Sequence, residues 1–283
     1  MHKIRIVTDS TADLPAELVE QYDITVVPLK IIFSDEEVYR DKVDITLDRF
    51  YERLAQLPAS TSQPSPAEFL EVYKPFTEAG EQIISIHISA KLSGTVHSAQ
   101  AARALLPGAS IDVIDSKAAS VPLGMAVLAA ARAAQAGRSR DQILGMLDRL
   151  LAGSRTYFMV DTLDYLQRGG RIGKAQALLG TLLNIKPLLT LEDGLVSPFE
   201  KVRGQAKGLD RLATVLAEAA AGGRVQYAVV HGNTPDLYAR MLKTLTERVG
   251  FGPRLASRVG GVVGTHTGPG VVGFSVHPAV EDE

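Results

Sequence analysis

One stretch decides the predicted fold: Gln82-Ile83-Ile84-Ser85-Ile86-His87-Ile88-Ser89-Ala90-Lys91-Leu92-Ser93-Gly94-Thr95. Residues 82–88 are apolar enough for a strand buried on both faces, as in a parallel sheet. A turn follows, then a predicted helix over residues 95–106 and another strand over residues 111–114. Such alternation favours a parallel sheet with helices on both faces.

The same alternation extends through the rest of the first half. Residues 4–7 predict a strand, and the turn Asp9-Ser10-Thr11-Ala12-Asp13 leads into a helix that Pro15 begins. Ser65-Pro66-Ala67-Glu68 matches a capping box with proline at the first helical position. The other predicted elements are an extended run at residues 25–33 and helices at residues 46–54, 66–79 and 120–136.

The second half has a different pattern, which predicts a mixed sheet with helices. The predicted strands are residues 156–160, 186–191, 195–197, 226–230 and 271–276, and the predicted helices are residues 204–221 and 235–249. Glu192-Asp193-Gly194 is typical of a hairpin turn. We therefore expect an N-terminal α/β domain at residues 1–152 and a C-terminal α/β domain at residues 153–283.

The composition of the 283-residue chain is that of a soluble globular protein, with 46% hydrophobic and 22% charged residues. Its formal net charge is −2, so nucleic acid and anionic membranes are poor candidate partners. The absence of cysteine excludes disulfides, thiolate catalysis and zinc–sulfur sites. The first residues do not predict a signal peptide, and no apolar run approaches the ~20 residues of a membrane span, so we expect a cytoplasmic protein.

Three turns rich in hydroxyl groups and glycine carry the candidate ligand contacts. In Ser60-Thr61-Ser62-Gln63-Pro64-Ser65-Pro66, Thr61 and Ser62 remain available because Ser65 caps the next helix. Ser93 follows a buried strand and begins a helix, where free amides and the dipole favour an anion. In Gly264-Thr265-His266-Thr267-Gly268-Pro269-Gly270, the imidazole of His266 stands on a turn whose glycines allow close approach to a ligand.

Each of these residues also has an ordinary structural interpretation. Ser93 could be a helix cap, and His266 could be an exposed histidine on a surface turn. Together the turns supply hydroxyls, amides and one imidazole, without a carboxylate pair or a metal-ligand cluster. This set favours holding a small anionic group such as a carboxylate over hydrolysing a bond, and it predicts neither a metal nor a cofactor.

Arginines form a second group of candidates. Gln167-Arg168-Gly169-Gly170-Arg171-Ile172-Gly173 is a glycine-lined loop, and Arg203 precedes a predicted helix. Arginine is well suited to phosphate oxygens, because its planar fork of donors matches their geometry. We interpret Arg168 as a solvated surface residue, and Arg171 and Arg203 as residues that face a phosphate or a partner.

These motifs, in this order, resemble the DegV family. The resembling segments are Val7-Thr8-Asp9-Ser10-Thr11-Ala12-Asp13-Leu14-Pro15, Thr61-Ser62-Gln63-Pro64-Ser65, Ile86-His87-Ile88-Ser89, Leu92-Ser93-Gly94-Thr95, Val113-Ile114-Asp115-Ser116, Gly169-Gly170-Arg171-Ile172 and the turn around His266. They span almost the whole chain. The resemblance implies a two-domain α/β lipid binder, similar to the fatty-acid-binding subunit of bacterial fatty acid kinase.

In that system a separate kinase subunit phosphorylates the carboxyl group of the bound fatty acid, and the acyl-phosphate feeds phospholipid synthesis. The resemblance implies that Thr61 and Ser93 donate hydrogen bonds to the carboxylate, with His266 completing the network and Ser62 nearby. It also implies that Arg171 and Arg203 face the kinase or the incoming phosphate. The carrier itself would have no catalytic residue. Burying the methylenes of a palmitate-like chain would contribute a binding free energy on the order of 12 kcal/mol. This burial needs an apolar tunnel between or within the domains.

A second hypothesis is a serine hydrolase or acyltransferase that uses Ser93 or Ser62 with His266. The chain has no Gly-x-Ser-x-Gly elbow, and Asp9 or Asp115 could orient the imidazole only if the fold brought one of them close. A third hypothesis, a nucleotide-binding sugar or phosphate enzyme, lacks a P-loop.

Overall fold

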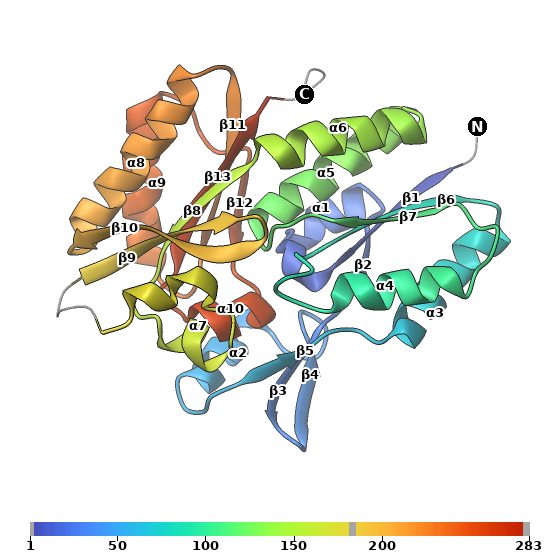
Figure 1. Cartoon of the computed structure of the whole chain (residues 1–283), viewed down its shortest axis with the longest axis horizontal. Coiled ribbons are helices and arrows are strands. Elements are labelled where there is room, and N and C mark those ends of the chain that lie inside the picture. Colours follow the sequence, from blue (N-terminus) through green and yellow to red (C-terminus); the bar gives the residue numbers. More distant parts are fainter. Residues whose placement is uncertain (1–2, 181–184, 280–283) are drawn as a thin grey trace.

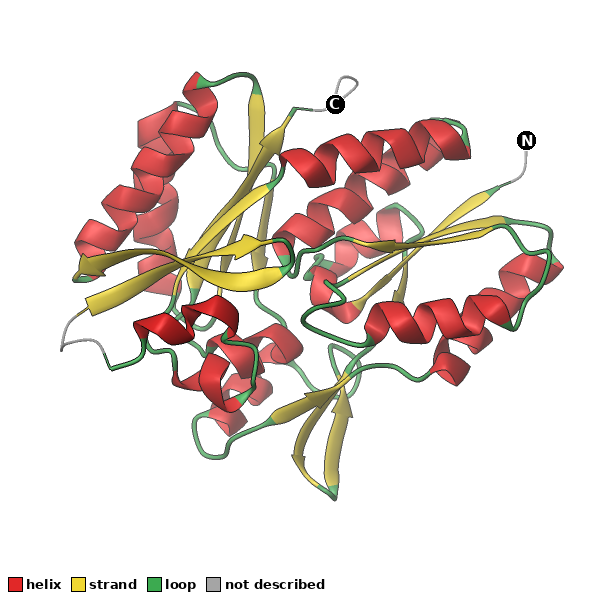
Figure 2. Ribbon diagram, in the orientation of Figure 1, coloured by secondary structure: helices red, strands yellow, loops and turns green. Residues whose placement is uncertain are grey.

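The computed structural model describes residues 3–180 and 185–279. Its N-terminal sheet has the order β2-β1-β6-β7, and all its strands are parallel. The strands are β1 (Ile4–Asp9), β2 (Thr25–Val27), β6 (Gln82–His87) and β7 (Ile111–Asp115), and the helices of this half are α1 (Ala16–Gln21), α3 (Pro66–Glu78), α4 (Thr95–Ala104), α5 (Val121–Gln135) and α6 (Arg140–Gly153). Figures 1 and 2 show the helices on both sides of this sheet, as expected from the sequence.

Alternating side chains on β1 explain why both faces are covered. Val7 packs with Phe69 and Ala99, which belong to α3 and α4. Its neighbour Ile6 packs on the opposite face with residues of α5. Because successive side chains of a strand point to opposite faces, an apolar strand needs a helical layer on each side.

The C-terminal sheet is mixed, with the order β10-β9-β8-β13-β11-β12. Only β11 and β12 pair in parallel; the other neighbours are antiparallel. The strands are β8 (Arg155–Met159), β9 (Ile185–Glu192), β10 (Leu195–Arg203), β11 (Val225–His231), β12 (Leu255–Arg258) and β13 (Val272–Pro278). Helices α8 (Gln205–Ala221) and α9 (Pro235–Val249) cover one face of it (Figure 1). The expected mixed sheet is therefore confirmed.

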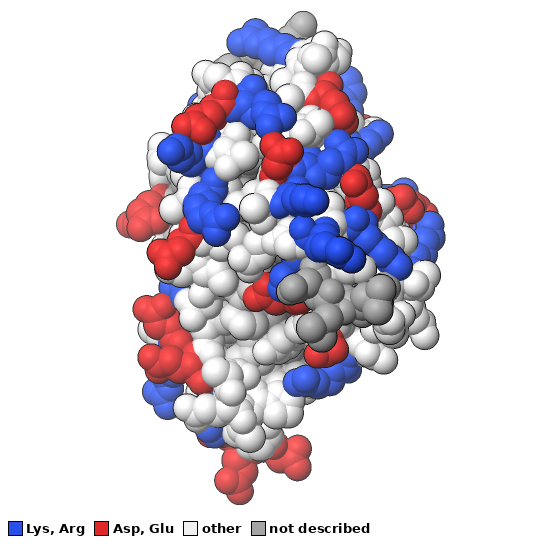
Figure 3. Space-filling model, turned by 90° about the vertical axis from the view of Figure 1, so that its left-hand side faces the viewer, with Lys and Arg blue, Asp and Glu red and all other residues white. Residues whose placement is uncertain are grey.

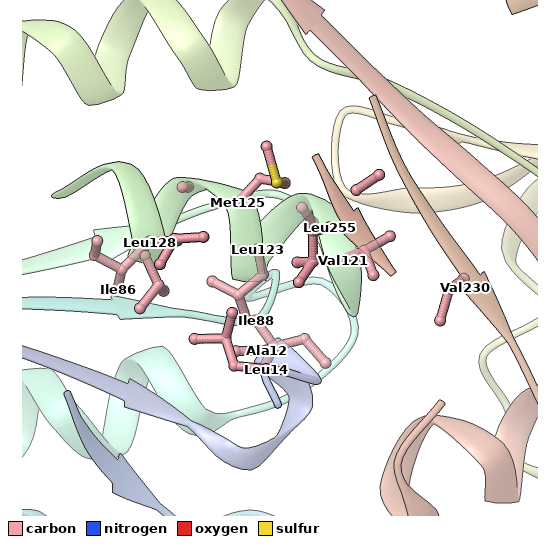
Figure 4. Packing of buried hydrophobic residues seen from close by; sticks show 14 of the residues in the cluster. Ala12, Leu14, Ile86, Ile88, Val121, Leu123, Met125, Leu128, Val230 and Leu255 are labelled. Carbon is pink, nitrogen blue, oxygen red and sulfur yellow. The ribbon is translucent and has the colours of Figure 1, made fainter. Parts of the chain in front are cut away.

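Helix α5 lies between the two sheets. It contacts β1 and β6 on one side and β11, β12 and β13 on the other. Figure 4 shows Val121, Leu123 and Leu128 of this helix packed among apolar residues from both halves of the chain. One hydrophobic core therefore joins the two sheets. Helix α6 packs beside α5 and against β13.

A small third sheet corrects one expectation. The run at residues 25–33 is two strands instead of one, because Pro28 and Leu29 separate β2 from β3 (Lys30–Ser34). Strand β3 pairs with β4 (Glu37–Arg40) and β5 (Ser60–Ser62) in the order β4-β3-β5, beside helix α2 (Leu47–Leu54). Proline has no amide hydrogen and cannot continue a sheet ladder, so the chain leaves the parallel sheet at Pro28.

Within the described ranges, four short helical segments complete the fold. They are η1 (Ser10–Ala12), α7 (Asp164–Arg168), η2 (Gly173–Leu178) and α10 (Gly261–Thr267). The last of these corrects a second expectation, because it places His266 in the final turn of a short helix and not on an open turn. Among the described residues, no helix is long and apolar enough to span a bilayer.

Candidate functional site

A pocket opens between the C-terminal sheet and the loops at the carboxyl ends of the parallel strands. The space between its lining residues amounts to about 960 Å³ when the part that is open to solvent is included. Arg171 is the single charged residue among its described lining residues. Ligands of open parallel sheets usually gather at this edge, because the connecting loops leave a crevice there.

Most of the pocket wall is apolar. Ile88 and Leu92 come from the loop after β6, and Val121 from the start of α5. Phe158 and Val230 come from the C-terminal sheet. Binding an apolar ligand against such a wall is favourable by about 25 cal/mol for each Å² of apolar surface removed from water. The pocket is therefore suited to a long apolar group.

Polar side chains gather at one part of the pocket. Thr61 Oγ1 and His266 Nε2 are 2.8 Å apart, although 205 positions separate the two residues in the sequence. In β5, Thr61 is paired with Ile31, which packs with Val262 of α10, so Thr61 faces the helix that carries His266. Two of the three predicted turns thus meet directly.

The imidazole of His266 is held in a mainly apolar setting. Burial, followed by the positive charge of Arg171, lowers the pKa of His266 to about 4, so the ring is neutral at pH 7. Its Nδ1 atom is buried without a hydrogen-bond partner in the described part of the chain. Gly169 lies against the ring, since a Cβ built at that position would be 2.0 Å from Nδ1.

Among the residues that the structure describes, no group is placed to orient His266 as a catalytic histidine. In a hydrolase triad, a carboxylate accepts a hydrogen bond from the ring nitrogen that faces away from the nucleophile. Asp9 instead binds His87 Nδ1 at 3.0 Å, and Asp115 accepts from the amides of Ala90 and Lys117. Neither aspartate is the partner of His266.

Ser93 lines the same pocket, next to the amino terminus of α4. Its hydroxyl is 2.9 Å from that of Thr95. The next residue, Gly94, lies against the side chain of Gln63, because a Cβ there would be 2.5 Å from Gln63 Nε2. This contact brings the loop that contains Ser93 beside the strand that contains Thr61.

Arg171 completes the polar part of the pocket. Its Nε donates to the carbonyl of Leu92 at 3.1 Å, and its Nη1 donates to the carbonyl of Gly169 at 2.7 Å. Both acceptors are neutral, and no carboxylate pairs with this arginine among residues 3–180 and 185–279. Its charge is therefore available to an anionic ligand.

Two predicted residues do not line the pocket. Ser62 follows Thr61 in β5, and neighbouring residues of a strand point to opposite faces, so its hydroxyl reaches the carbonyl of Gln63 instead. Arg203 is exposed at the end of β10 and paired in register with Ile185. Among the described residues there is also no group of three or more potential metal ligands.

Several contributors to the site are not among the residues predicted from the sequence. Gln63 and Ser120 line the pocket, and Gly169 makes room for the imidazole. Glycine in the Gly169-Gly170 pair was a usable signal, because glycine often permits close approach. Ser120 has no such signal in the sequence; its backbone has a φ of 65°, which is strained for a residue with a side chain.

A buried chain of hydrogen bonds lies beside the pocket and contains a second histidine. His87 Nε2 is 2.6 Å from Ser85 Oγ, which accepts from Tyr73 OH at 2.7 Å, while Nδ1 faces Asp9. Ser85, His87 and Asp9 are fully buried, and none of them lines the pocket. Asp9 also accepts from the amide of Ile88 at 3.0 Å, so this network fastens the ends of β1 and β6 together.

The fold and the pocket define a class of α/β protein in which an apolar cavity lies between a parallel and a mixed sheet. A family model described as "Uncharacterised protein, DegV family" matches residues 3–279. A DegV domain-containing protein of Streptomyces coelicolor is 42% identical over 276 residues, which cover 96% of this chain and 98% of the relative. The chain belongs to the DegV family.

Solved structures of this family are similar throughout their length. A DegV family protein from Thermus thermophilus, described by its fatty acid binding, superposes with a TM-score of 0.91 at 37% identity, covering 98% of this chain and 100% of that one. A stearic acid-binding protein from Eubacterium ventriosum has a TM-score of 0.91 at 32% identity and 98% coverage of both chains. DegV from Bacillus subtilis, called a fatty acid binding protein, has a TM-score of 0.89 at 34% identity, covering 99% of this chain and 100% of that one.

Proposed function

We propose that this protein binds a long-chain fatty acid and holds its carboxylate at Thr61, Ser93 and His266. The observation that carries this proposal is an apolar pocket whose polar part joins a threonine, a serine, a neutral imidazole and one arginine. The family neighbours described as fatty-acid-binding proteins share the fold over nearly the whole chain.

The polar residues suit a carboxylate that is removed from water. An unpaired carboxylate in an apolar cavity would lose several kcal/mol of solvation, so hydrogen-bond donors must replace water. Thr61 and Ser93 supply hydroxyl donors, and the neutral ring of His266 can donate through one nitrogen. Arg171 adds a full positive charge within reach of the same region, which favours an anionic head group.

The ligand itself can be identified directly. We expect protein purified from a bacterial host to release a long-chain fatty acid into an organic solvent, detected by mass spectrometry. Ser93→Ala should weaken fatty acid binding about tenfold, since a hydrogen bond to a charged group contributes roughly 1.5–3 kcal/mol. Circular dichroism should show that this variant remains folded. An empty pocket in the wild type, or an unchanged affinity in the variant, would contradict the proposal.

The finer part of the proposal is that a separate kinase phosphorylates the bound carboxylate. Arg171 supports it, because a guanidinium that no described carboxylate neutralises could also bind phosphate oxygens beside the head group. Lys and Arg side chains, interspersed with Asp and Glu, are exposed on the side of the molecule that carries α8, α9 and the ends of β9 and β10 (Figure 3). On this side Lys201, Arg203 and Lys207 are exposed and form no ion pair within the described residues, so we propose that they face the partner.

The partnership is tested by mixing the loaded protein with a fatty acid kinase subunit and ATP. We expect acyl-phosphate to form only when all three components are present. Arg203→Glu should slow its formation and leave fatty acid binding unchanged, because Arg203 lies outside the pocket. Hydrolysis of a p-nitrophenyl ester by the isolated protein, abolished in His266→Ala, would instead support the hydrolase hypothesis.

A further inference from the structure

The helix that carries His266 begins between two buried aspartates. The amide of Gly260, the N-cap of α10, donates to Asp13 Oδ1 at 2.9 Å. The next amide, that of Gly261, donates to Asp41 Oδ1 at 3.1 Å. Both aspartates are 1% exposed. They come from the N-terminal half of the chain, while α10 belongs to the C-terminal half.

The two aspartates differ in how their charge is balanced. Asp13 Oδ1 also accepts from Lys42 Nζ at 2.9 Å, and its Oδ2 accepts from Ser120 Oγ at 2.7 Å. Asp41 Oδ2 is buried without a partner in the described part of the chain. Burial is the main reason that the pKa of Asp41 is raised to about 6. The charge of Lys42 opposes the shift, Asp13 adds to it, and hydrogen bonds from Ser10 and from the amide of Gly261 oppose it more weakly.

A buried carboxylate with an unpartnered oxygen is costly, because desolvation penalises the charge. Such a residue needs a compensating role. The contact of Asp41 that could supply this role is its hydrogen bond from Gly261 N, at the start of α10. Natural proteins tolerate such costs mainly where function requires a particular geometry.

Close packing holds α10 firmly against its neighbours. A Cβ at Gly261 would be 2.3 Å from Ile31 Cδ1, and one at Gly264 would be 2.9 Å from Tyr51 OH, so the helix backbone lies directly on β3 and α2. His266 is five residues after Gly261, which corresponds to about 7.5 Å along a helix. A shift at the first amide is therefore transmitted to the imidazole, whose contact with Thr61 tolerates little displacement.

We propose that Asp41, assisted by Asp13, is a positioning residue for His266. Its carboxylate fixes the first turn of α10, and the rigid helix then presents the imidazole to Thr61 and to the head group of the ligand. Asp41 does not line the pocket and would not touch the ligand. The inference rests on the proposed function, because its consequence is measured in fatty acid affinity.

A double-mutant cycle separates positioning from general stability. The dissociation constant of a defined probe, palmitate, is measured for the wild type, Asp41→Ala, His266→Ala and the double variant. We expect Asp41→Ala to weaken binding about tenfold in the wild-type background and less than about twofold in the His266→Ala background, since contacting or coupled residues are non-additive. Equal weakening in both backgrounds would show a structural role only and would overturn the proposal, as would no weakening at all.

Two further variants make the test specific. Asp41→Asn keeps an oxygen acceptor for Gly261 N and should retain affinity within about threefold of the wild type. Asp44→Ala is a matched control on the same loop, where Asp44 binds the exposed Arg40, and it should leave affinity unchanged.

If Asp41→Ala is unfolded by circular dichroism, Asp41→Glu, which displaces the carboxylate by one methylene, takes its place with the same expected result. A wild type that binds no palmitate contradicts the proposed function, whereas a bound palmitate with an additive cycle contradicts only the role of Asp41.

Discussion

At the scale of single residues, the surroundings of His266 set the protonation state of its ring. Burial keeps the ring neutral, and the same burial makes a hydrogen bond from it stronger than it would be in water. A neutral ring beside Arg171 also avoids placing two cations side by side. The pocket can therefore accept an anion without a large positive charge of its own.

The titration of His266 should respond to the ligand. In the ligand-free protein its pKa is about 4, below the 6.5 of an unperturbed histidine. A bound carboxylate should raise this pKa, because an opposite charge favours the protonated ring. NMR titration of the ring protons, with and without fatty acid, measures the shift. An unchanged pKa on binding would mean that the head group lies away from the ring.

The same pKa predicts how stability depends on pH. Because the folded pKa is depressed, the unfolded chain binds more protons between pH 6.5 and 4. The free energy of unfolding of the ligand-free protein should therefore fall by up to about 3 kcal/mol as the pH drops through this window. Urea denaturation at several pH values measures it, and His266→Gln should show a smaller fall.

The opposite orientations of two adjacent hydroxyls lead to a further prediction. Thr61→Val removes the partner of His266 Nε2 and should weaken fatty acid binding at least tenfold. Ser62→Ala is its matched control, because Ser62 does not line the pocket, and affinity should not change. Isothermal titration with palmitate measures both. Weaker binding in Ser62→Ala would restore Ser62 to the site.

At the scale of elements, the β9–β10 hairpin closes over loops of the parallel sheet. Ser89 Oγ donates to the carbonyl of Gly194 at 2.8 Å, and this bond is buried. Asp193 forms ion pairs with Lys91 and Lys117, which together lower the pKa of its carboxyl group. These contacts join the two halves of the chain next to Leu191 and Ile88, which line the pocket.

Gly194 is the residue of this hairpin that should resist substitution. Its φ is +81°, and a Cβ would be 2.3 Å from Ser89 Oγ. Gly194→Ala should lower the free energy of unfolding by at least about 2 kcal/mol, from backbone strain and the clash together. In a Ser89→Ala background the substitution should cost only the strain, about 1 kcal/mol. Urea denaturation of the four proteins measures the difference, and an equal cost in both backgrounds would contradict this account.

The exposed ion pairs at the same hairpin should matter less. Asp193→Asn is expected to leave the free energy of unfolding, measured by urea denaturation, close to that of the wild type, because solvent screens exposed charges.

At the scale of the whole molecule, α5 makes the two sheets one cooperative unit. Leu123 of this helix is fully buried in the core that spans both sheets. Leu123→Ala should lower the free energy of unfolding by about 2–5 kcal/mol through the cavity it leaves. Far-UV circular dichroism and tyrosine fluorescence should report a single coincident urea transition. Leu105→Ala, at a side chain that is 62% exposed, is the matched control and should change stability by less than about 0.5 kcal/mol. Separate transitions would show that the halves unfold independently.

The division into residues 1–152 and 153–283 stays a prediction. The expected boundary lies at the end of α6, directly before β8. However, α5 and α6 precede it and cover one face of the C-terminal sheet. The two halves therefore share a core, which a boundary read from the sequence does not reveal.

Most elements could be predicted because their signals are local. The capping box at Ser65 and Glu68, and the apolar run of β6, depend on residues a few positions apart. Helix α6 was missed although Ser139 and Gln142 form a similar box, so a usable signal existed there. Strands β4, β5 and β12 are short and carry no such pattern, because partner strands stabilise them more than their own residues do.

The sequence by itself determined which residue types could bind an acidic head group and which strands lead into the loops that carry them. Only the tertiary structure decided which of them meet. It joined Thr61 to His266, added Arg171 and Gly169, and left Ser62 and Arg203 outside the pocket. The physical reason is range: capping and periodicity act over about one helical turn, whereas a pocket depends on packing between segments far apart in the chain.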